Sequence, residues 1–118
     1  MREDDVAALR HEFAAGEGSF LLRLRCESEW DRDAFSRLVG AMERCAAAHE
    51  GRQEIERWVA NGFWYLERFV PEWTSHPDFP RLDDQGYYQE ACRRLSDLAY
   101  WLFFGESPDQ GRGPLPPL

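Results

Sequence analysis

The sequence predicts an all-α protein, a small helical bundle of about four helices with one long Pro-rich crossover between the third and the fourth helix. Three observations lead to this prediction. Apolar residues recur at spacings of three and four along most of the chain, glycines and prolines separate these segments, and no two segments alternate in a way that would pair them as strands. The length of 118 residues is that of one domain.

The first predicted helix covers Asp4–Ala15, begins with acidic residues that suit the helix dipole, and places three apolar residues on one face: Val6, Leu9 and Phe13. The segment Ser19–Arg25 fits either a short helix capped by Ser19 or a brief strand. We favour the helix because the chain offers no second strand to pair with it.

The second predicted helix, Glu29–His49, starts after Ser28, which has Asp31 three residues further on and so resembles a capping box. Its apolar arc contains Ala34, Phe35, Leu38, Ala41, Met42, Cys45 and His49. We expect His49 to be a hydrogen-bonded residue at the end of this helix.

The third predicted helix, Gln53–Val70, has a broad apolar stripe of Ile55, Trp58, Val59, Gly62, Phe63, Leu66, Phe69 and Val70. Pro71 is expected to end or bend it. The fourth helix, Tyr87–Phe104, has an apolar arc of Tyr88, Ala91, Cys92, Leu95, Leu98, Ala99, Leu102 and Phe103. Residues 1–105 are thus predicted to be one helical domain, and residues 106–118 a Pro/Gly-rich C-terminal tail.

The charge of the chain limits its partners. The net charge is −8, and all fourteen basic residues are arginine. An acidic surface disfavours nucleic acid and anionic membrane and allows a basic protein partner. No apolar run reaches membrane-spanning length, the N-terminus is unlike a secretory signal, and three widely separated cysteines fit a reducing compartment. We therefore expect a cytoplasmic protein.

The predicted crossover, Pro71–Gly86, is long enough to hold a functional site. One interpretation is a pocket beneath it, lined by Trp73, His76, Tyr87 and Tyr88. The other is that Trp73 and Phe79 fold back and cover the end of the bundle. The spacing of histidines, cysteines and acids matches no metal motif or phosphate loop, so we expect no metal ion and no cofactor.

Two tryptophans fall outside the apolar arcs of their helices. Trp64 lies near Arg57 and Arg68 on the third helix, and Trp101 lies near Arg94 on the fourth. Either the N-terminal segments cover them, or they form an exposed aromatic–arginine patch of the kind enriched in protein interfaces.

These observations favour a non-catalytic protein-interaction module that uses the Trp64 and Trp101 region. Its partner would be a basic protein, as for an acidic inhibitor or immunity-like protein, or a second copy in a homodimer. The alternative is a protein that binds a small molecule or metal in a pocket under the Pro71–Gly86 loop, or an enzyme with its active site there. No nucleophile–base pair or paired carboxylate stands out, which weighs against catalysis.

Overall fold

The computed structural model describes residues 1–80 and 85–108, and this part of the chain consists of helices without a strand. The helices are α1 (Glu3–Phe13), α2 (Phe20–Glu27), α3 (Arg32–Ala48), α4 (Arg57–Ser75) and α5 (Gln85–Phe104). The all-α class is confirmed, but five helices replace the predicted four because the ambiguous segment forms α2. Most of the predicted tail, and residues 81–84 of the predicted crossover, lie outside the described residues.

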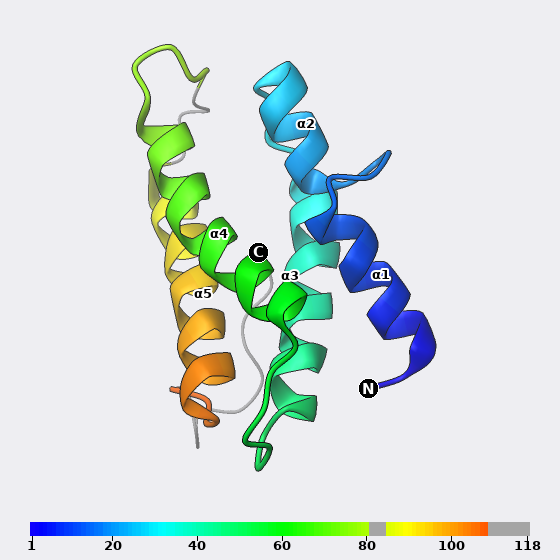
Figure 1. Ribbon diagram of the computed structural model, residues 1–118. Coiled ribbons are helices and arrows are strands. Elements are labelled where there is room, and N and C mark those ends of the chain that lie inside the picture. Colours follow the sequence, from blue (N-terminus) through cyan, green and yellow to red (C-terminus); the bar gives the residue numbers. More distant parts are fainter. Residues whose placement is uncertain (81–84, 109–118) are drawn as a thin grey trace.

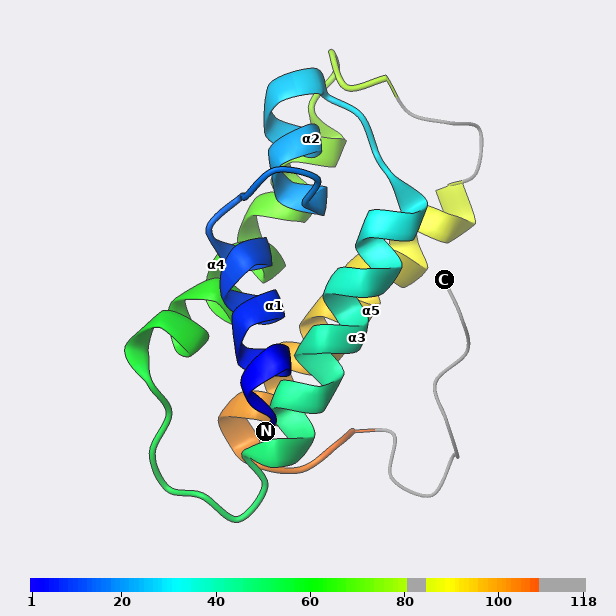
Figure 2. The ribbon, with the colours of Figure 1, turned by 90° about the vertical axis from the view of Figure 1, so that its right-hand side faces the viewer.

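The long helices α3, α4 and α5 form the body of the molecule (Figure 1). Helix α5 packs against both α4 and α3, antiparallel to α4 and in the same direction as α3 (Figures 1 and 2). Helices α1 and α2 pack on α3. The side of the α4–α5 pair that faces away from α1, α2 and α3 is therefore left without a covering helix in the described chain.

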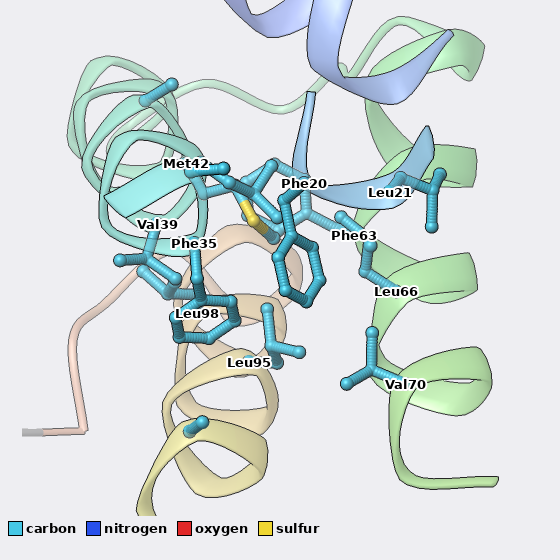
Figure 3. Close-up of a cluster of buried hydrophobic side chains, with 14 of the residues drawn as sticks. Phe20, Leu21, Phe35, Val39, Met42, Phe63, Leu66, Val70, Leu95 and Leu98 are labelled. Carbon is cyan, nitrogen blue, oxygen red and sulfur yellow. The ribbon is translucent and has the colours of Figure 1, made fainter. Parts of the chain in front are cut away.

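The core is built where α2, α3, α4 and α5 converge. Figure 3 shows Phe20, Phe35, Phe63 and Leu95, one from each of these helices, directed into a common interior, and all four are fully buried. Each buried phenylalanine or leucine contributes about 1.5–3 kcal/mol through the removal of apolar surface from water. The predicted apolar arcs of α3, α4 and α5 together supply most of the remaining core.

A second group of buried rings closes one end of the core, and we call it the Trp30 cluster: Phe20, Trp30, Phe35, Tyr87 and Tyr88. The Trp30 ring lies 4.8 Å from that of Phe20 and 5.1 Å from that of Tyr88, centroid to centroid. The Trp30 Nε1–H donates a 2.9 Å hydrogen bond to Tyr87 Oη. The cluster joins the N-terminal half of the chain to α5, with its one indole donor satisfied.

The junction of α2 and α3 differs from the prediction. Ser28 is not the N-cap of a helix; it ends α2 in the left-handed conformation, with φ 51°. Asp31 caps α3 instead, and its Oδ1 accepts a 3.1 Å hydrogen bond from the Ala34 backbone N–H. That bond holds the pKa of Asp31 below its usual value, helped by the Arg23 guanidinium. Ser28 already ends α2 and so does not cap the next helix, and α3 begins at Arg32 instead of at Glu29.

Of the two outcomes predicted for Pro71, an end or a bend of the helix, the end does not occur, and α4 continues to Ser75. Proline removes one backbone donor from the helix interior. The turn that follows is held by other contacts: Thr74 is buried and its Oγ1 donates 2.9 Å to the Val70 carbonyl, while Ser75 Oγ donates 2.6 Å to the Pro71 carbonyl. Burial and side-chain hydrogen bonds thus outweigh the lost backbone bond, and the connection to α5 starts at His76 rather than Pro71.

Candidate functional site

Four large aromatic side chains of α4 and α5 are exposed, and we call them the α4–α5 aromatic face. Trp64 on α4 is 55% exposed, and Tyr100, Phe103 and Phe104 on α5 are 41%, 44% and 71% exposed. The Tyr100 and Phe104 rings stack with their centroids 4.5 Å apart. Scattered exposed apolar residues are normal, whereas exposed aromatics gathered on one helix pair are typical of interaction sites.

Trp64 has the surroundings that the sequence indicated. The Arg68 guanidinium lies over its ring, 5.2 Å from the centroid, and Arg57, at the start of the same helix, is exposed. A guanidinium over an indole is an attractive pair at a surface. Trp64 and Arg68 therefore present a flat aromatic group together with a positive charge to solvent.

Trp101 and Arg94 lie elsewhere, on the side of α5 that faces α3. Trp101 is half-buried against the core, and its Nε1–H donates 2.6 Å to Glu50 Oε1. Arg94 is buried and forms an ion pair with Glu43, whose atoms lie 3.6 Å apart. Burial raises the pKa of Glu43, against the attraction of Arg94. The structure therefore separates the five residues of the predicted patch: Trp64, Arg57 and Arg68 face solvent, whereas Trp101 and Arg94 tie α5 to α3.

Phe103 was expected in the core and is instead 44% exposed. It occupies the last turn of α5, next to Leu102, which is buried, so the predicted arc is only partly covered there. Tyr100 has no place in the predicted arc and contributes to the exposed surface. The spacing of apolar residues alone does not predict which aromatic residues at the end of a helix are exposed.

A cavity of about 370 Å³ lies at the C-terminal end of α4, and it is the second candidate site. Trp73 and His76, two of the four residues predicted for a pocket here, line it. The other lining residues are Ser28, Phe69, Glu72, Asp78 and Phe79. Phe79 is buried and packs edge-to-face on Tyr88, with centroids 6.3 Å apart, as expected for a residue that covers the bundle end.

Tyr87 and Tyr88, the other two predicted pocket residues, do not line the cavity. Both are buried in the Trp30 cluster, and the Arg32 guanidinium lies 3.9 Å from the centroid of the Tyr87 ring. Trp30 itself had no predicted role. It falls within the second predicted helix, Glu29–His49, but not in its apolar arc, and in the structure it precedes the α3 N-cap, so only its contacts across the fold reveal its role.

Cys45 and His49 form a close pair that resembles a nucleophile and its base, with Sγ 3.7 Å from Nδ1. Their geometry argues against that chemistry. The His49 Nδ1 lies 2.8 Å from the Cys45 carbonyl oxygen, so Nδ1 carries the proton and cannot accept one from the thiol. Burial also raises the pKa of Cys45 to about 11. The pair is a helix-end contact, as expected for His49.

Within residues 1–80 and 85–108, no group of three histidines, cysteines or acids could hold a metal ion, and no helix is long and apolar enough to cross a membrane. Comparisons with protein-family models, with curated proteins and with solved structures found no match to this chain. A function is therefore inferred from the geometry of the two candidate sites.

Proposed function

We propose that this protein is a non-catalytic protein-interaction module that pairs with a second copy of itself through the α4–α5 aromatic face. The observation that carries the proposal is the coincidence of four exposed aromatics with a helix pair of zero net charge. Helix α4 contains Arg57, Glu67, Arg68 and Glu72, and α5 contains Glu90, Arg93, Arg94 and Asp97. The whole net charge of −8 consequently lies outside these two helices.

This charge distribution favours a second copy over a basic partner at the aromatic face. Two copies that met through any strongly acidic part of the chain would repel each other, whereas two neutral faces do not. A two-fold pairing also brings the same patch of both copies together, so an interface on this helix pair adds no net charge. Aromatic and arginine residues are the types that contribute most to such interfaces.

The test is the molar mass in solution as a function of protein concentration, measured by sedimentation equilibrium. The wild-type chain is expected to pass from monomer to dimer. Trp64→Asp places a charge in the face and is expected to weaken dimerisation about 30-fold, which corresponds to a hot-spot loss of about 2 kcal/mol. Ala7→Asp adds the same charge to an exposed position of α1 and is expected to leave the dimer unchanged.

A basic protein partner is the second candidate function, because acidic residues gather outside the neutral helix pair. One group opens α1, and others flank the α2–α3 junction and the α3–α4 connection: Glu3, Asp4 and Asp5; Glu27, Glu29, Asp31 and Asp33; Glu50, Glu54 and Glu56.

The dependence of binding on salt concentration distinguishes the two candidate functions. Binding steered by these charges weakens steeply between low and moderate ionic strength, whereas aromatic self-association changes little. A wild-type chain that stays monomeric at all concentrations contradicts the dimer.

A further inference from the structure

We propose that the cavity at the C-terminal end of α4 binds the head group of an organic cation, an ammonium or guanidinium group. This inference goes beyond self-association and uses a different part of α4. The cavity combines the two kinds of group that attract such a cation, aromatic rings and carboxylates, and none of the described residues that line it is an arginine.

The aromatic walls are held in place by their neighbours. Phe69 and Trp73 are one helical turn apart on α4, with ring centroids 5.2 Å apart and planes inclined by 32°. Tyr65 stacks on the other side of Phe69, at 5.0 Å. Phe79 comes from the connection after α4 and is fixed by its buried contact with Tyr88. A cation that enters the cavity thus meets rings from two segments whose positions are already set, which lowers the cost of binding.

Two carboxylates line the same cavity. Glu72 lies between Phe69 and Trp73 in the sequence of α4, and Asp78 follows the helix; both are exposed. Within residues 1–80 and 85–108, neither forms an ion pair with an arginine, and the Asp78 carboxylate lies 3.9 Å from Nδ1 of His76. Elsewhere in the described chain, carboxylates such as Asp5 and Asp31 pair with arginines at 3.0 and 2.9 Å.

The aromatic rings of the cavity, like its carboxylates, have no arginine partner among the described residues, whereas several other aromatic rings do. Arginine guanidinium groups lie over Trp58, Tyr87 and Trp64, at 4.3, 3.9 and 5.2 Å from the ring centroids. No arginine of the described part of the chain stands over Phe69, Trp73 or Phe79. The protein therefore already pairs guanidinium with aromatic rings, and this cavity offers rings and carboxylates together to a cation from outside.

His76 does not oppose a bound cation. Its Nδ1 accepts a 3.1 Å hydrogen bond from the Asp78 backbone N–H, which requires an imidazole without a proton on Nδ1. Nδ1 therefore points no N–H into the site. The volume of about 370 Å³ exceeds what a trimethylammonium group needs and suits a head group with a short chain.

The test uses choline and its neutral isostere 3,3-dimethylbutan-1-ol as probes, with binding followed by the indole N–H signals of the five tryptophans in NMR spectra. Trp73→Phe assigns the Trp73 signal. We expect choline to move the Trp73 signal and the neutral alcohol to leave it nearly unchanged, because only the cation interacts with ring faces and carboxylates. The proposal is overturned if the two probes act equally, or if the Trp73 signal stays fixed throughout the choline titration.

Variants locate the site. Trp73→Leu is expected to weaken choline binding about 3- to 30-fold through loss of the cation–π interaction, and Glu72→Gln to weaken it about threefold at low salt. Glu72 is exposed, so its variant tests the site even if Trp73→Leu fails to fold. Glu67→Gln makes the same change on α4 at a residue that does not line the cavity, and it should bind choline like the wild type. Equal losses for Glu67→Gln and Glu72→Gln would contradict the assignment.

A second arm identifies the source of the cation. Short peptides with one central lysine, trimethyllysine or arginine are titrated in the same way. Stronger binding of a peptide than of choline indicates a side chain of a partner protein, and weaker binding indicates a free small molecule. Either result supports the cation site.

Discussion

The Trp30 cluster and the α4–α5 aromatic face are built from the same residue types and lie in opposite environments. Trp30 and its neighbours come from α2, the α2–α3 junction, α3 and α5, so segments far apart in the chain enclose them. Trp64, Tyr100, Phe103 and Phe104 lie on two helices whose outer side no described helix covers. None of them is a buried core residue, so the exposed part of their apolar surface does not contribute to the stability of the single chain. This difference is why we assign the first group to folding and propose the second as a binding surface.

The sharpest way to test this comparison is to remove one tryptophan from each group. Trp30→Ala is expected to lower the free energy of unfolding by about 3–5 kcal/mol, because a large buried ring leaves a cavity and its partners lose their packing. Trp64→Ala is expected to change it by about 0.5 kcal/mol or less in the monomer. Urea denaturation at a concentration where the chain is monomeric measures both. Similar losses for the two variants would mean that the aromatic face belongs to the core.

The second prediction compares a covered thiol with an uncovered one. Burial raises the pKa of Cys45 from 9.0 to about 11, so the unfolded chain loses this proton first and the contribution of the thiol to stability disappears as the pH rises from about 9 to 11. The loss should amount to about 2–3 kcal/mol. The chain has no lysine, but it has two further cysteines and four tyrosines, and burial also raises the pKa of Tyr87, so a control without Cys45 is needed.

Denaturation curves between pH 8 and pH 11 measure this loss, and Cys45→Ala serves as the control because it should lose less stability over the same range. Thiol labelling provides a second readout. Exposed Cys26 should react in the native protein, and Cys45 only after unfolding. Equal pH dependence of the wild type and Cys45→Ala would show that the thiol is not buried as described.

The third prediction compares a glycine of α4 that lies against another helix with a glycine of α3 that has more space around it. A Cβ atom at residue 62 would overlap the Phe13 ring, by which α1 packs against α4. Gly62→Ala is therefore expected to cost about 1–3 kcal/mol, even though alanine favours the helix. At Gly40 in α3 the nearest atom is the flexible Arg44 guanidinium, at 3.4 Å. Gly40→Ala is the matched control and should stabilise the protein by up to about 1 kcal/mol. If Gly62→Ala instead raised the free energy of unfolding, Phe13 would not pack against Gly62 as described.

The smallest expected effect concerns a single hydroxyl. Tyr87→Phe removes the acceptor of the Trp30 indole N–H and should lower the free energy of unfolding by about 1 kcal/mol. Tyr100→Phe removes the hydroxyl of an exposed tyrosine and should have no measurable effect. Thermal denaturation of the two variants side by side makes the comparison. If the two changes were equivalent, the hydrogen bond within the Trp30 cluster would contribute nothing to stability.

The sequence by itself determined the helical class and most of the core. Leu66, Val70, Leu95 and Leu98 are buried as their spacing predicted, because a stripe with the period of a helix must find an apolar neighbour. The sequence also predicted Ser19 as the N-cap of α2, because its side chain can accept a hydrogen bond from a backbone N–H three residues further on, here that of Leu22. The exposure of Trp64 was one of two outcomes that its helical position left open.

Tertiary structure decided whatever depended on contacts between distant segments. Pro71 stays inside α4 because burial of Thr74 outweighs a local preference, and Ser28 ends α2 while Asp31 caps α3. Trp101 is tied to Glu50, Arg94 to Glu43, and Trp30 to Tyr87, and none of these pairs is close in the sequence. Periodicity fixes the face of a helix on which a residue lies, but only packing fixes whether another helix covers that face.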